Sequence, residues 1–187
     1  SSVNSIGNFA FNKCSSLTHI TILSSAISIG CFVFNNIRSL TISGNMTQIK
    51  SRLFDKCKLL EEITIQSPIK SIGDYSFSYC EALEHVTLPS SVISIGDNAF
   101  MGCFSLKQFI IPPYTETIGK SAFCSCISLT QISIPSTVYS INKYAFRKCS
   151  NLKQISILSS TLTSFSEGLF DECSSLVEFS IPENVIK

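Results

Sequence analysis

The chain has little of what most enzymes and nucleic-acid-binding proteins need. Among its 187 residues are two histidines, no tryptophan and only 14% charged residues, and the formal net charge is +1. So small a charge gives no basic field for nucleic acid. Two histidines, without a G-x-S-x-G, H-E-x-x-H or glycine-rich phosphate motif, argue against a hydrolase or metalloenzyme. The sequence therefore predicts a non-enzymatic protein without catalytic residues, cofactor or metal.

Long apolar runs are also missing. No stretch approaches the roughly 20 apolar residues that span a bilayer, so we expect no membrane insertion. The first four residues, three of which are polar, do not resemble a signal peptide. Hydrophobic residues nevertheless make up 44% of the chain, which is too apolar for disorder.

What the chain does contain is an internal repeat. An isoleucine recurs about every 23 residues, usually before a glycine, and a phenylalanine follows this anchor by five residues. In seven copies a cysteine follows the phenylalanine by three. The consensus reads I-G-x-x-A-F-x-x-C-x-x-L-x-x-I-x-I-P. We predict a single domain over residues 1–187 of about eight repeats, starting near 6, 29, 49, 72, 95, 118, 141 and 165.

Two copies differ in length. The second copy lacks its cysteine and two neighbours, so that Ile37 takes the leucine place. The seventh gains one residue at 159–161, and both changes fall in expected turns, where length varies freely. The chain begins and ends in mid-repeat, and we expect it to be a fragment of a longer array.

The segment L-x-x-I-x-I alternates as a strand does, and prolines such as Pro89 end it. We expect such a strand in every copy, including the one with Phe109 and Ile111 facing inward. The glycine that follows most anchors, as at Gly73, suggests positive φ, and A-F-x-x-C fits one helical or 3-10 turn. The predicted class is an α/β leucine-rich-repeat solenoid, right-handed, curved and mostly strand and coil. A parallel sheet lies on its concave side and short helical or 3-10 turns on its convex side.

The consensus resembles the BspA-like leucine-rich repeat, also called the Treponema pallidum type. The best copies are residues 95–103 and 118–123, and the resemblance covers all eight repeats. It implies a binding role, often as a surface adhesin of bacteria or protozoan parasites toward host proteins. Cell-surface or extracellular location is suspected on this ground alone.

The nine cysteines allow three interpretations: buried thiols, disulfides or a metal site. Equivalent residues on stacked coils point in parallel, which favours buried thiols over bridges. Cys124 and Cys31 lie outside the repeat position and are the candidates for reactive thiols. His19 and His85 are about three coils apart, too far to share a metal. Asn45-Met46-Thr47 is a glycosylation sequon in a turn.

The outward strand positions form the candidate binding face. One outward column holds mainly amide and charged side chains, and the next holds short hydroxyl side chains. Together with a flanking column, the first column gives an acidic end at Glu61, Glu62 and Glu84 and a more basic end at Lys107 and Lys153. The candidate residues of the concave face are His19, Glu62, Thr64, His85, Thr87, Gln108, Ile110, Gln131, Ser133, Gln154 and Ser156. Ile110 is the one aliphatic residue among the hydroxyls, so contact is expected near it. The alternative is an exposed sheet that water alone covers.

We therefore predict a non-enzymatic protein-binding module with a protein partner of unknown identity. One alternative is a structural spacer or stalk. Another is the scaffold region of a larger multidomain protein, in which a catalytic or signalling domain lies elsewhere. The oligomeric state stays open.

Overall fold

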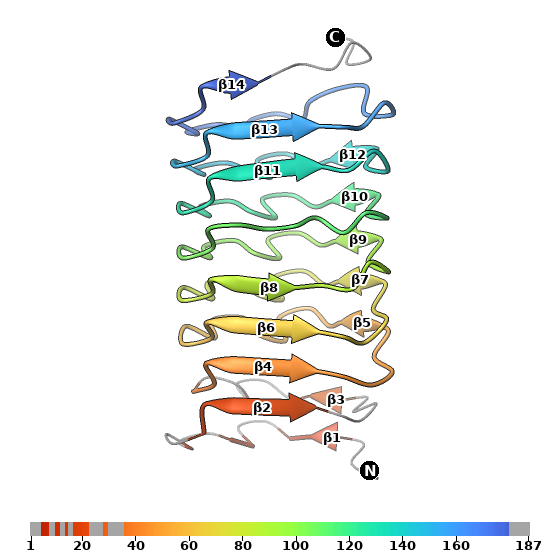
Figure 1. Cartoon of the computed structure of the whole chain (residues 1–187), viewed down its shortest axis with the longest axis vertical. Helices are drawn as coiled ribbons and strands as arrows, with labels where there is room; N and C mark the ends of the chain where they lie inside the picture. The colour runs from red at the N-terminus through yellow and green to blue at the C-terminus, as the bar shows by residue number, and fades with distance from the viewer. Residues whose placement is uncertain are drawn as a thin grey trace.

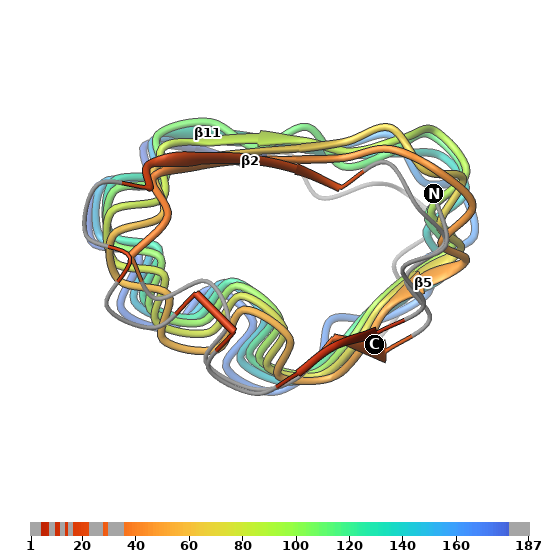
Figure 2. The ribbon, with the colours of Figure 1, turned by 90° about the horizontal axis from the view of Figure 1, so that it is seen from below.

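The computed structural model is a right-handed solenoid whose coils rise in one stack from the N-terminus to the C-terminus (Figure 1). It describes residues 5–7, 10–11, 14, 17–22, 28–29 and 36–179. Seen along the stack, the coils superpose, with the longer strands on one wall and short strands on another (Figure 2). The predicted parallel-strand solenoid is confirmed, whereas the division into eight repeats stays a prediction.

The longer strands form the front wall, in two parallel sheets ordered β2-β4-β6-β8 and β11-β13-β14. Their isoleucines face inward as expected: Ile63, Ile65 and Ile134 are at most 2% exposed. Equivalent residues pair from coil to coil, so each column of the repeat becomes a ladder. The front strands are β2 (His19–Ile22), β4 (Ser39–Ile42), β6 (Glu62–Ile65), β8 (His85–Thr87), β11 (Gln131–Ile134), β13 (Gln154–Ile157) and β14 (Glu178–Phe179).

A second set of strands, which the repeat pattern does not reveal, forms the back wall. The anchor isoleucines sit in two-residue strands that pair in parallel. They are β1 (Ser5–Ile6), β3 (Ser28–Ile29), β5 (Gln48–Ile49), β7 (Ser71–Ile72), β9 (Ser94–Ile95), β10 (Thr117–Ile118) and β12 (Ser140–Ile141). The sheet runs without interruption from β5 to β12, and β1 pairs with β3.

The front wall is interrupted between β8 and β11. The strand expected around Phe109 and Ile111 is absent, although both side chains are buried, at 6% and 4% exposure. Phe109 puts a ring where all other copies except the last, which has Phe179, have an aliphatic residue, and its centroid lies 4.8 Å from those of Phe100 and Phe123. Pro112 and Pro113 follow, and neither can donate to a strand ladder. Pro112 is shared with copies that keep their strand, such as those ending at Pro89 and Pro135, so Pro113 is the feature that distinguishes this segment.

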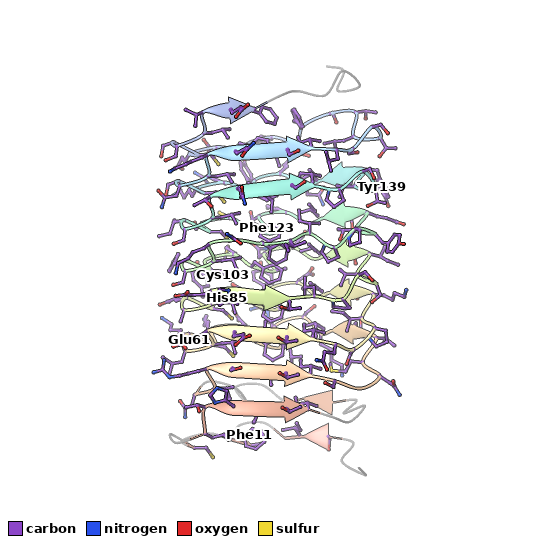
Figure 3. All side chains as sticks on the ribbon, in the orientation of Figure 1. Phe11, Glu61, His85, Cys103, Phe123 and Tyr139 are labelled. Atoms are coloured by element: carbon purple, nitrogen blue, oxygen red, sulfur yellow. The ribbon has the colours of Figure 1, made fainter. Side chains whose placement is uncertain are left out.

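The repeat phenylalanines form a continuous stack inside the coils, in which Figure 3 labels Phe123. Phe54, Phe77, Phe100, Phe123 and Phe146 are all fully buried. Neighbouring ring centroids lie 5.0–5.4 Å apart, with planes within 14° of parallel. One ring per coil thus fills the interior along the described stack.

The convex turns are present at A-F-x-x-C but are not helical, and the described residues contain no helix or 3-10 helix. Alternate amides bond in two directions: the Ser78 amide donates within its own turn to Tyr75, while that of Phe77 donates to Ala99 of the next coil. Because every second amide donates to a carbonyl of the next coil, the turn lacks the consecutive i→i+3 or i→i+4 hydrogen bonds that a helix needs. The turns also place residues such as Tyr75 and Tyr79 at positive φ, 56° and 54°.

The expected positive φ at the glycine after the anchor is wrong, since Gly73, Gly96 and Gly119 do not have it. These glycines serve close contact between coils. A Cβ on Gly119 would lie 2.5 Å from the backbone carbon of Gly96, whereas one on Gly7 would meet nothing within 4 Å.

Phe100→Ala should lower the free energy of unfolding by about 3–5 kcal/mol, because it removes a fully buried ring from the middle of the stack. Chemical denaturation followed by circular dichroism measures this loss. Tyr114→Ala is the matched control, since that ring is 63% exposed. An unchanged midpoint for Phe100→Ala would contradict the phenylalanine ladder.

Gly119→Ala should destabilise the protein by about 1–3 kcal/mol, the usual range for forcing an extra carbon into a packed site. Gly7→Ala, at the same repeat position with open space around it, should leave the midpoint almost unchanged. Thermal unfolding of the two variants provides the comparison. Equal effects would show that chain flexibility, and not contact between coils, selects glycine here.

Candidate binding surface on the front sheet

The outward columns lie on the front wall as predicted. His19, Ser39, Glu62 and His85 are in register across β2, β4, β6 and β8. Gln131 pairs with Gln154, and Ser133 with Ser156, across β11 and β13. Side chains of equivalent residues therefore project side by side, one per coil.

A shallow groove of about 600 Å³ lies over the interruption and the two strands above it. It brings together six of the predicted residues, namely Gln108, Ile110, Gln131, Ser133, Gln154 and Ser156. We call it the amide groove. Ile110 is 83% exposed within it, so its side chain is held out toward solvent.

The residues that form the apolar edge of the amide groove were not among the predicted site residues. Pro113, Pro135 and Leu158 line it, and Leu158 is 61% exposed. Its signals are in the sequence: the Pro112–Pro113 pair, and a leucine where neighbouring copies have proline. The buried Phe109, Ile111 and Ile132 complete its floor.

The other predicted residues lie toward the N-terminus. His19, Glu62 and His85 line a second groove of about 550 Å³, which we call the charged groove, together with Arg38, Glu61 and Glu84. Figure 3 labels Glu61 and His85 on this wall. Thr64 and Thr87 are in register on β6 and β8 but line neither groove.

Opposite charges of the flank pair across neighbouring coils, which adds contacts that the expected acidic and basic ends do not include. Arg38 pairs with Glu61, and Lys107 Nζ lies 2.9 Å from Glu84 Oε2. The hydrogen bond and the charge of Lys107 lower the pKa of the Glu84 carboxyl. These pairs are exposed, so they contribute little stability but cancel the local field.

The repeat cysteines form a second interior column, in which Figure 3 labels Cys103. All eight described cysteines are free thiols; Cys31 lies outside the described residues. The thiol of Cys103 donates to the carbonyl oxygen of Phe77 in the coil below, with an S···O distance of 3.2 Å. Cys80, Cys126 and Cys149 make the same contact at 3.1–3.2 Å. The column therefore links each coil to the previous one.

Burial makes these thiols weak nucleophiles. Removal from water, with a smaller contribution from the nearby Asp55, raises the pKa of Cys57 to about 12. Burial likewise raises the pKa values of Cys103 and Cys126 well above their usual range. A thiol acts as a nucleophile or metal ligand as its thiolate, so the buried thiols of Cys57, Cys103 and Cys126 are unsuited to either role.

Other candidate sites are few in the described part of the chain. It holds no group of three possible metal-ligating side chains. Nor does it hold a helix long and apolar enough to cross a bilayer. Asn45 and Thr47 of the sequon are exposed, which leaves its modification a prediction.

Comparison with known families gives one match over the whole chain. A model described as the BspA type leucine rich repeat region, in six copies, matches residues 1–103 and 70–187. A search of curated proteins found no match.

Several solved structures share the fold. A leucine-rich-repeat protein of Treponema pallidum is 28% identical, with a TM-score of 0.72 over 75% of this chain and 67% of its own. One from Bacteroides ovatus is 31% identical, with a TM-score of 0.70 over 74% of this chain and 38% of its own. A leucine-rich cell surface protein of Faecalibacterium prausnitzii is 25% identical, with a TM-score of 0.53 over 97% of this chain and 72% of its own. The chain thus spans little more than a third of the Bacteroides ovatus protein.

The buried thiols predict a loss of stability at alkaline pH. The unfolded chain releases the Cys103 proton near the ordinary pKa of 9.0, whereas the folded chain retains it. This contribution is complete below pH 9 and is lost as the pH rises toward the folded pKa, at up to about 1.4 kcal/mol per pH unit. Cys103→Ala should therefore lose stability less steeply than the parent above pH 9 in denaturation series.

Tyrosines and lysines ionise in the same range in both proteins, so the difference in slope isolates the thiol. Identical slopes would contradict the assignment. Mass spectrometry of the unreduced protein offers a second check, and a native bridge such as Cys80–Cys103 would refute the free-thiol column.

Proposed function

The chain belongs to the BspA-type leucine-rich-repeat family, and on that premise we propose that it is a non-enzymatic protein-binding module. Its binding site is the amide groove, and its partner is another protein. We also propose that it acts at the cell surface as an adhesin-type protein, a location supported by the relative described as a leucine-rich cell surface protein.

One observation carries the binding proposal, which is the position of Ile110. Its side chain is 83% exposed at a place where the neighbouring coils have Thr87 and Ser133. Amides and hydroxyls surround it in the amide groove. An apolar anchor ringed by hydrogen-bonding groups is the usual arrangement of an interface hot spot. A single exposed aliphatic residue needs no explanation, but one set among aligned amides in a groove supports a contact.

The chemistry of the described side chains supports a non-enzymatic role. Neither histidine lines the amide groove. The interior thiols have raised pKa values and are occupied in bonds to backbone carbonyls. Catalysis by acid, base or nucleophile needs such groups exposed and poised near neutral pH.

The proposal predicts which variants lose a partner. A partner is first identified by probing an array of secreted and cell-surface proteins with the purified chain. Ile110→Ser and the double variant Gln131→Ala/Gln154→Ala should each weaken its affinity about tenfold or more, near 1.4 kcal/mol. Both should fold normally, because these side chains lie outside the core.

Val177→Ser is the matched control, since Val177 is 86% exposed and does not line the amide groove. Unchanged affinity for the groove variants would exclude the amide groove as the site. Loss of affinity in Lys148→Ala would then move the contact to the convex turns. An array without any partner would favour the spacer or the scaffold of a larger protein.

A further inference from the structure

We propose that the amide groove takes an uncharged, largely aliphatic peptide segment of the partner, an inference that rests on the function proposed above. The inference concerns the chemical class of the ligand and comes from what lines the two grooves of the front wall.

The absence of ionisable side chains is the first observation. None of the twelve residues that line the amide groove is ionisable. Arg38, Glu61, Glu62 and Glu84 line the charged groove on the same wall, with two histidines. Lys107 and Lys153 flank the amide groove without lining it, and Lys107 is paired with Glu84. A charged ligand would lose water here without gaining a partner of opposite charge, which is costly.

The arrangement of polar and apolar groups is the second observation. Along each of three coils the lining passes from an amide, through Ile110 or a serine, to a proline or leucine. Each glutamine amide both donates and accepts hydrogen bonds, which is what every peptide bond of an extended chain also does. The opposite edge, made by Pro113, Pro135 and Leu158, has no polar side-chain group and suits aliphatic side chains.

The aromatic content distinguishes a peptide from a sugar. Sugar rings pack best on the exposed face of an aromatic side chain. The one ring in the amide groove belongs to Phe109, which is 6% exposed. The exposed rings of Tyr114 and Tyr139 lie outside the lining, and Figure 3 labels Tyr139 at the edge of the wall. The groove therefore favours a peptide over a glycan.

A phage-displayed library of random peptides, selected on the parent chain alone, tests the inference. We expect the recovered sequences to be rich in aliphatic residues and poor in charged ones. A synthetic peptide of the recovered sequence should bind Ile110→Glu at least about tenfold more weakly, because the carboxylate would be buried without a partner. Its affinity should change by less than about twofold between roughly 0.1 and 1 M NaCl, since screening acts on charges.

Val177→Glu adds the same charge at an equally exposed position outside the amide groove and should bind the peptide as the parent does. Circular dichroism of both variants confirms that each is folded. The chain is also applied to a glycan array.

The two proposals can fail separately. Charged peptides, or glycans alone, whose binding is lost in Ile110→Glu would overturn the ligand class and leave the amide groove as the binding site. Peptides that bind Ile110→Glu like the parent, or no ligand in either library, would overturn both.

Discussion

Parallel hydrogen bonding between successive coils is the constraint on which the remaining structure depends. It brings equivalent residues of neighbouring repeats into register, as with Ile49, Ile72 and Ile95 on the back wall. Once the register is fixed, a residue type that recurs in sequence must become a ladder in space. The stacked phenylalanines, the thiols that bond the coil below and the outward amides all follow from that single condition.

Much of this could be predicted because the repeat specifies which residues align. The inward isoleucines of β6 and β11 and the outward column through Gln131 and Gln154 follow directly from two-residue alternation in a strand. The back wall escaped prediction because its strands are two residues long, too short for any periodicity to show. The positive φ positions also escaped, because residues such as Tyr75 and Lys56 occupy most of them, and the glycines that do, such as Gly102, are not those that follow the anchor isoleucine.

The candidate site was likewise predictable from the sequence only in part. Six of its residues were predictable as neighbours, since they are outward members of adjacent coils. The hollow itself was not, because it depends on the loss of a strand at residues 107–112, which the repeat pattern predicts to be present. The ion pairs of the flank were missed for a related reason. The sequence assigns Glu84 to the acidic end and Lys107 to the basic one, and only the register shows that the two side chains are in contact.

The interruption also has a mechanical consequence. The back wall is one continuous sheet from β5 to β12, whereas the front wall divides into four strands and three. Strand hydrogen bonds are thus continuous along the back wall from β5 to β12 and are interrupted in the front wall between β8 and β11. Bending at this interruption would therefore break fewer strand hydrogen bonds than bending that separates the strands of the back wall. We therefore expect the solenoid to bend more easily on the side of the amide groove than on the side of the back wall.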